Sequence, residues 1–175
     1  KDYNPVMQVH STSTPTYTGR AVWFNTYSNG SGYCGSNNNY ISYPAGTTTT
    51  AAMILTVGNS DLHGAFLRKN GVAIAAGSAS YTGTPPINNY SGAAYTHLGD
   101  GGAGLGAGQY FDGSIAEIVV CDHLYRDDVW AEWYLSQKYG ITLDASHPFY
   151  AAAPTTGPRV TGSVRAVNIR GGADQ

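Results

Sequence analysis

The chain has 175 residues, enough for one domain with a sizeable hydrophobic core and too few for two comfortable ones. Only 11% of the residues are charged and the formal net charge is −2, which excludes the broad basic surface that binds nucleic acid through counterion release. Glycine (23) and tyrosine (14) are abundant, a composition typical of β-rich proteins that work outside cells or on particle surfaces.

The first predicted strands alternate with turn-rich segments. Residues 6–10 form one possible strand, and residues 11–19 have the Ser/Thr/Pro composition of a linker or exposed loop. Strands are then predicted at 20–26 and 40–44, separated by an Asn-Gly and glycine-rich segment that favours tight turns. The continuous apolar run "AAMILTVGN" at 51–59 has the length of a further strand.

A β-hairpin is the strongest local signal in the chain. Two short strands within residues 65–77 meet at Asn70-Gly71, a dipeptide with a strong preference for hairpin turns. Arg68 lies just before this turn, where we expect its charge to be solvated. The next predicted strand lies near residues 95–99.

One helix is predicted, at residues 126–140. Asp127 and Asp128 lie in its first turn, where the helix dipole favours negative charge, and Gly140 is placed to end it. The residues at the spacing of one helix face, which we expect to lie against the body of a β-protein, are Ala131, Tyr134, Leu135 and the stem of Lys138. We therefore assign this helix to packing and not to chemistry.

Two carboxylates lie inside the predicted strand "SIAEIVVCD" at 114–122. Because side chains alternate across a regular strand, Glu117 and Asp122 fall on opposite faces and cannot form the carboxylate pair of a glycosidase. We interpret Glu117 as a structural carboxylate that accepts hydrogen bonds from a turn or a neighbouring strand. Asp61 and Asp100 stay open as distant catalytic partners.

Tyrosines in or beside Asn/Gly/Ser-rich loops are the candidate ligand-binding residues. Aromatic faces with nearby amide side chains suit a polar, low-charge ligand such as a sugar, and Tyr, Ser, Gly and Asn also dominate adaptable protein-binding loops. The alternative is that these tyrosines cap the edge of the core with their hydroxyls in water. Tyr27 has this setting, and the candidates for ligand contact are Tyr33, Tyr40, Tyr81, Tyr90, Tyr95, Asn38 and Asn89.

Metal and cysteine chemistry is sparse. No pair of histidines has metal-ligand spacing, so zinc is not expected; calcium stays open as a cofactor, with Asp100 and Asp112 as oxygen ligands. Cys34 and Cys121 allow two alternatives, one disulfide or two buried thiols. Neither a Gly-x-Ser-x-Gly elbow nor a cysteine-nucleophile signature is present, so no enzyme of those classes is expected.

Four stretches together resemble the C-terminal half of laminin G-like, concanavalin A-like jelly-roll domains, which are found in bacterial surface proteins and phage structural proteins. They are "FLRKNGVAIA", "HLGDG", "YFDGSIAEIVV" and "YLSQKYGI", within about residues 51–142. The most specific parts are F-D-G-x-I-A-E-I at 111–118 and E-x-Y-L-x-x-K-Y-G-I at 132–141. The resemblance implies an all-β fold, an antiparallel jelly-roll sandwich with one short helix, in which these motifs maintain the fold. The Glu-x-Asp-x-Glu pattern of the related glucanases is missing, which argues against hydrolysis.

The chain is divided into three predicted parts. Residues 1–19 form an N-terminal strand and linker, residues 20–144 the jelly-roll domain, and residues 145–175 a linker and a tail. A possible strand at 164–169 can close the sheet of its own domain or add to the exposed edge of a neighbour. No apolar stretch reaches the roughly 18 residues of a membrane span, so none is expected.

These features predict a non-catalytic recognition or adhesion module, extracellular or on a cell or virion surface, whose partner is a glycan or a surface protein. The alternative is a virion structural protein, such as a phage decoration, fibre or receptor-binding component, whose tails dock on neighbouring subunits. A glycan-cleaving enzyme is a third possibility that rests on analogy of fold alone.

Overall fold

The computed structural model consists mainly of antiparallel strands and contains one helix among the residues it describes, which is compatible with the predicted all-β class. It describes residues 3–10, 20–36, 39–60, 64–74, 79–81, 95–99, 111, 113–120, 127–155 and 165–167. The chain divides into two compact units. Unit 1 comprises Lys1–Thr49, Val57–Leu67 and Ala73–Asp112; unit 2 comprises Thr50–Thr56, Arg68–Val72 and Gly113–Gln175.

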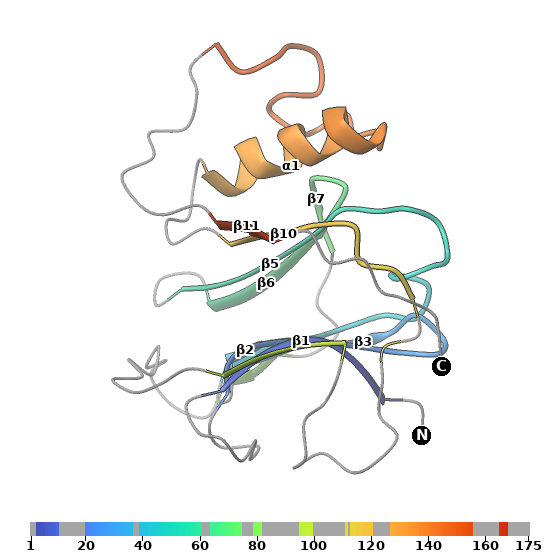
Figure 1. The fold of residues 1–175 in the computed structure, drawn as a ribbon, viewed down its shortest axis with the longest axis vertical. Coiled ribbons are helices and arrows are strands. Elements are labelled where there is room, and N and C mark those ends of the chain that lie inside the picture. Colours follow the sequence, from blue (N-terminus) through green and yellow to red (C-terminus); the bar gives the residue numbers. More distant parts are fainter. Residues whose placement is uncertain are drawn as a thin grey trace. The chain divides into compact units, whose positions relative to one another are not determined.

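Eleven strands and one helix follow one another along the described part of the chain, most of them labelled in Figure 1. They are β1 (Tyr3–His10), β2 (Arg20–Tyr27), β3 (Gly32–Ser36), β4 (Asn39–Tyr43), β5 (Leu55–Ser60), β6 (Gly64–Lys69), β7 (Val72–Ala73), β8 (Ala79–Tyr81), β9 (Tyr95–Leu98), β10 (Ile118–Val120), α1 (Asp127–Tyr139) and β11 (Arg165–Val167). The strands predicted at 20–26 and 40–44 are confirmed as β2 and β4. The strand predicted at 51–59 begins later, at Leu55.

A six-stranded sheet in unit 1 has the order β8-β4-β3-β2-β1-β9. Its neighbouring strands pair antiparallel, and in the centre Asn25 of β2 pairs with Tyr33 of β3, which pairs with Ser42 of β4. The N-terminal strand β1 pairs with β2 on one side and with β9 on the other. Residues 3–10 therefore belong to the same sheet as the strands that begin at residue 20.

The sequence does not predict strand β3, because "GYCGS" lies in the glycine-rich segment that is expected to form tight turns. The turn itself is short: Gly30 has a φ of 77° and its N–H donates to Tyr27 O over 2.9 Å. The chain then returns as β3 between β2 and β4. Two glycines give this segment a weak strand preference, which pairing on both sides overrides.

The predicted hairpin is confirmed. Asn70 and Gly71 have φ values of 51° and 86°, the pair of positive angles that a type I′ turn requires. This turn joins β6 to β7 in a three-stranded sheet of order β5-β6-β7. Asn70 also holds the residue that precedes β5, because its Oδ1 accepts from Ile54 N and its own N–H donates to Ile54 O, both over 2.9 Å.

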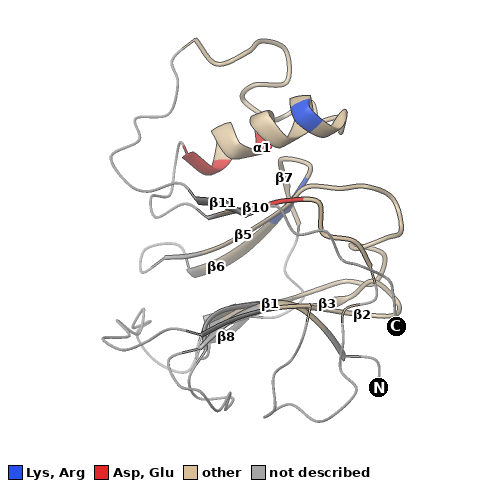
Figure 2. Ribbon diagram, in the orientation of Figure 1, with Lys and Arg blue, Asp and Glu red and all other residues tan. Residues whose placement is uncertain are grey.

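Helix α1 begins and ends where the sequence predicts. Figure 2 shows acidic residues at its start and a basic residue near its end, in the arrangement that complements the helix dipole. Gly140 follows the helix with a φ of 65°, and Ile141 N donates to Ser136 O over 3.1 Å to close the last turn.

The predicted packing face of α1 is largely wrong. Its buried residues are Asp127, Asp128, Ala131, Glu132 and Ser136. Tyr134 and Leu135 are only partly buried, and Lys138 is exposed. The helix thus turns carboxylates inward, and two of them, Asp128 and Glu132, have ion-pair partners within unit 2.

The C-terminal part of unit 2 differs in two ways from a free linker and tail. Strand β11 pairs antiparallel with β10, with Val119 opposite Ala166, so the tail strand pairs within its own chain. His147 lies in the segment that the sequence predicts to be a linker, yet it is only 4% exposed. Among the described residues, no helix is long and apolar enough to cross a membrane.

Candidate functional site

Three tyrosines gather on one face of the unit 1 sheet. Tyr33 of β3 lies opposite Asn25 of β2 and Ser42 of β4. Tyr27 comes two residues after Asn25 in β2, and Tyr40 comes two residues before Ser42 in β4. Side chains two apart in a strand share a face, so the three rings lie on the same side. The ring centroids of Tyr27 and Tyr33 are 6.1 Å apart and those of Tyr33 and Tyr40 are 5.8 Å apart, both edge-to-face. We call Tyr27, Tyr33 and Tyr40 the tyrosine face.

The opposite face of the same strands is the core of unit 1. Phe24, Cys34 and Ile41 are opposite one another in adjacent strands and are 7%, 0% and 4% exposed. The Phe24 ring also stacks on the Tyr43 ring, with centroids 5.8 Å apart. Because this apolar side is buried, the alternation of the strands turns the tyrosine face away from it, and its three rings stay partly exposed.

A buried amide lies beside the tyrosine face. Asn25 is 0% exposed, and its Oδ1 accepts from the backbone N–H of Tyr33 over 3.1 Å. Its Nδ2 has no hydrogen-bond partner among the described residues. A buried donor without a partner costs about 1–3 kcal/mol.

The structure brings together only some of the residues that are predicted to bind a ligand. Tyr33 and Tyr40 come together, whereas Tyr81 and Tyr95 lie in β8 and β9, the two edge strands of the six-stranded sheet. Tyr27 has the same loop setting but is not among the predicted ligand contacts. Asn25 is not predicted either, although the alternation of Asn25 and Tyr27 in "FNTY" is a usable signal. The candidates that lie outside the described residues are Asn38, Asn89, Tyr90, Asp100, Asp112 and Cys121.

Cys34 is a free thiol in the structure. Its candidate disulfide partner, Cys121, lies outside the described residues. Cys34 is 0% exposed, and its Sγ lies 3.9 Å from Phe66 O in unit 1. Burial raises the pKa of this thiol to about 12. The thiolate is the reactive form, so Cys34 is a core residue and not a nucleophile.

No cluster of three or more His, Cys, Asp or Glu side chains that could hold a metal ion occurs within the described part of the chain. Calcium therefore stays a prediction that depends on Asp100 and Asp112.

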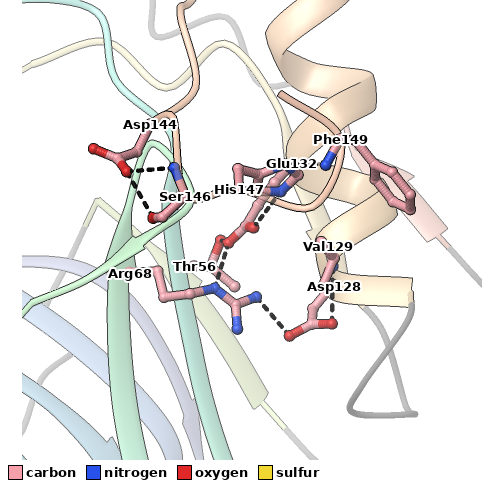
Figure 3. A network of polar contacts seen from close by, with 9 residues as sticks. All are labelled: Thr56, Arg68, Asp128, Val129, Glu132, Asp144, Ser146, His147 and Phe149. Atoms are coloured by element: carbon pink, nitrogen blue, oxygen red, sulfur yellow. Dashed lines mark hydrogen bonds and ion pairs between the residues drawn. The ribbon is translucent and has the colours of Figure 1, made fainter. Parts of the chain in front are cut away.

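A network of buried charges in unit 2 connects the hairpin to the helix (Figure 3). Glu132 of α1 is 1% exposed, and its Oε1 accepts from Arg68 Nε over 2.8 Å and from Thr56 Oγ1 over 2.5 Å. The Arg68 guanidinium also donates to Asp128 Oδ2 over 2.5 Å. Although burial alone would lower the pKa of Arg68, these hydrogen bonds and charges raise it overall. The prediction that the Arg68 charge is solvated is therefore wrong.

His147 completes this network from the segment that follows α1. Its Nε2 is 3.1 Å from Glu132 Oε2, and its Nδ1 accepts from the backbone N–H of Phe149 over 3.1 Å (Figure 3). Because Nδ1 accepts, the ring proton lies on Nε2 and is donated to Glu132. Gly71 makes room for the ring, since a Cβ there would lie 2.5 Å from His147 Cδ2.

Every polar group at the centre of the network has a partner. Glu132 accepts at both oxygens, and both ring nitrogens of His147 are engaged. A general acid or base needs a free position within reach of a substrate, which this arrangement does not offer. The network is therefore structural: it fixes α1 to the hairpin and to residues 144–150.

Glu117 is a structural carboxylate, but its partners come from the helix and not from a turn or a strand. Its side chain is 3% exposed and accepts from Lys138 Nζ over 2.9 Å, from Tyr139 OH over 2.9 Å and from Tyr134 OH over 3.3 Å. Lys138 Nζ also lies 5.3 Å from the centre of the Tyr134 ring. Burial by itself raises the pKa of Glu117, but the hydrogen bonds from Lys138 and Tyr139 outweigh it, so this pKa lies below its usual value.

Replacing Glu117 by glutamine is expected to remove an acid-sensitive part of the stability. Because the folded pKa is below the ordinary value of 4.5, the charged carboxylate stabilises fully above that pH and loses its effect as the pH falls through the folded pKa. The Tm difference between the wild type and Glu117→Gln should be largest near neutral pH and shrink below about pH 4. A difference that stayed constant from neutral pH to pH 3 would contradict the ion pair with Lys138.

Comparisons with protein-family models, curated proteins and solved structures gave no match to this chain. The tyrosine face is the candidate for ligand binding because its three rings are partly exposed. The charge network is buried and connects elements of the fold.

Proposed function

We propose that this chain is a non-catalytic recognition or adhesion module that works outside cells or on a particle surface and binds glycans. The observation that carries this proposal is the tyrosine face. Three partly exposed rings at centroid distances of 6.1 and 5.8 Å lie on one face of the same sheet. Aromatic rings offer apolar area at low entropic cost.

We further propose a jelly-roll sandwich of the laminin G-like, concanavalin A-like class. Support comes from contacts between the stretches that carry the resemblance. Glu117 of the first motif accepts from Tyr134, Lys138 and Tyr139 of the second. Glu132 of the second motif accepts from Arg68 of the hairpin. Motifs that maintain a fold are expected to contact one another in this way.

The absence of catalysis is part of the proposal. Glu117 is held by three donors, and within that cluster no second carboxylate approaches it. A glycosidase needs two carboxyl groups about 5 to 9.5 Å apart on one cleft wall, one of them free to take or give a proton. The bonding of Glu117 favours a structural role over a glycan-cleaving one.

The test is a glycan array probed with the full chain, with and without a chelator. We expect specific binding that falls at least about tenfold in the double variant Tyr33→Ala/Tyr40→Ala. Chelator sensitivity would add calcium to the proposal.

The matched control is Ser28→Ala, an exposed turn position that follows β2 in the same unit. It should bind as the wild type does. Tyr33→Phe/Tyr40→Phe keeps the rings and separates the part played by the hydroxyls. Absence of binding to any glycan, or full binding by the folded Tyr33→Ala/Tyr40→Ala variant, would overturn the proposal.

A further inference from the structure

A groove lies at the C-terminal end of α1 in unit 2. Its volume is about 280 Å³. The residues that line it are Ser136, Gln137, Gly140, Ile141, Thr142, Leu143, Phe149 and Tyr150. The chain after α1, orange in Figure 1, turns back toward the helix, which brings residues 149 and 150 to the same groove as 136 and 137. We call this feature the helix-end groove.

Two aromatic residues of the groove are positioned by the buried network. Phe149 N–H donates to His147 Nδ1 over 3.1 Å, and its ring lies edge-on to the His147 ring with centroids 5.8 Å apart. Tyr150 N–H donates to His147 O over 3.0 Å. His147 is itself 4% exposed and held by Glu132. The backbone under both rings is therefore fixed before any ligand arrives, although Tyr150 is 52% exposed.

Two polar side chains of the groove, Gln137 and Thr142, are exposed. They contribute an amide and a hydroxyl, and no hydrogen bond within the described residues engages these side-chain atoms. A hydroxyl both donates and accepts, and an amide has two donors and one acceptor oxygen. Gly140, with its φ of 65°, ends the helix at the groove without a side chain to fill it.

No charged residue lines the groove, which decides the class of ligand. An anionic or cationic ligand would find no counter-charge there, whereas a neutral, hydroxyl-rich ring finds an aromatic surface for its C–H face and partners for its hydroxyls. Ligand pockets usually have about 300–1,000 Å³, so 280 Å³ suits one sugar ring and not a long oligosaccharide.

We propose that the helix-end groove is a binding subsite for one neutral sugar residue of a glycan. The inference rests on the proposed function for its ligand class, but it uses different residues in the other unit. Tyr150 stacks on the sugar ring, and Gln137 and Thr142 hydrogen-bond its hydroxyls. A ligand of this size binds with a dissociation constant on the order of 1 mM, so the subsite adds to affinity by acting together with another.

The test is an NMR titration of the isotope-labelled full chain with the methyl glycosides of glucose, galactose, mannose and N-acetylglucosamine. We expect saturable shifts of the backbone amides of residues 136–150 with at least one probe. Tyr150→Ala should weaken this binding about tenfold, and Tyr150→Phe, which keeps the ring, should retain it. No saturable shift in the groove with any probe, or equal binding by Tyr150→Ala, would overturn the subsite.

The two proposals fail separately in this design. Glycan-array binding that depends on Tyr33 and Tyr40, together with a groove that is silent in the titration, would overturn the subsite and leave the proposed function standing. Binding in the groove that Tyr150→Ala abolishes and Tyr33→Ala/Tyr40→Ala leaves unchanged would support the subsite even if the tyrosine face bound nothing. If neither the array nor the titration showed binding, both proposals would be wrong.

Discussion

Replacing Glu132 by alanine is expected to lower the free energy of unfolding by about 3–5 kcal/mol. The carboxylate is 1% exposed and accepts hydrogen bonds from Thr56, Arg68 and His147. Without this carboxylate, the Arg68 guanidinium keeps its hydrogen bond to Asp128 but loses the one to Glu132. The Nε2 proton of His147 loses its acceptor. The cost is that of buried polar groups left unpaired, which exceeds the net value of the pair when intact.

Urea denaturation followed by tryptophan fluorescence measures this effect, since Trp130 and Trp133 lie in the same helix. Gln137→Ala is the matched control because Gln137 is exposed in α1, and it should change the stability by no more than about 0.5 kcal/mol. Glu132→Gln keeps the shape but cannot accept from both Arg68 and His147, so it should fall between the two. A loss below about 1 kcal/mol for Glu132→Ala would show that the network does not hold the helix in place.

Replacing Gly32 by alanine is expected to destabilise the six-stranded sheet by about 3 kcal/mol. A Cβ at this position would lie 2.6 Å from Tyr43 Cζ and would also overlap Asn25 O and the Tyr43 hydroxyl. Tyr43 OH donates to Asn25 O across this glycine, so the added methyl group also breaks that hydrogen bond. One of these obstacles is backbone, so a side-chain rotation cannot relieve the clash.

Gly46→Ala separates this steric effect from backbone strain. Gly46 has a φ of 79°, but no atom lies within 4 Å of the Cβ it would gain. Its cost should therefore be only about 1 kcal/mol, the penalty of a left-handed conformation for alanine. Equal losses of stability for the two variants in urea would contradict the close approach of Tyr43 to Asn25.

The Gly32 variant also connects the fold to the tyrosine face. Gly32 precedes Tyr33 in β3, and Asn25 is bonded both to Tyr43 through its carbonyl oxygen and to Tyr33 N–H through its side chain. A shift of β3 to relieve the clash would move Tyr33 relative to Tyr27 and Tyr40. Glycan binding should therefore fall together with stability in Gly32→Ala, and should persist in Gly46→Ala.

Elements that depend on a few adjacent residues are predicted correctly from the sequence, whereas elements that depend on contacts with distant residues are not. The composition of the sequence makes Tyr33 and Tyr40 ligand candidates. It does not show that they lie together, because a turn-rich segment is predicted where the structure has strand β3. The alternation of Asn25 with Tyr27 indicates the face on which Asn25 lies, but the sequence gives no sign of which group it will meet. Its partner, the N–H of Tyr33, is specified by the pairing of β2 with β3.

The amino-acid sequence is sufficient to predict the Asn70-Gly71 turn and the start and end of α1. These depend on the backbone preferences of a few adjacent residues, such as positive φ at Gly71 and Gly140. The inward orientation of Glu132 depends instead on tertiary packing, because Arg68 and His147, the groups that satisfy this carboxylate, are 64 and 15 residues away along the chain. Such contacts depend on how distant segments pack and not on any pattern within one segment, since a carboxylate is buried only where partners from elsewhere offset its desolvation.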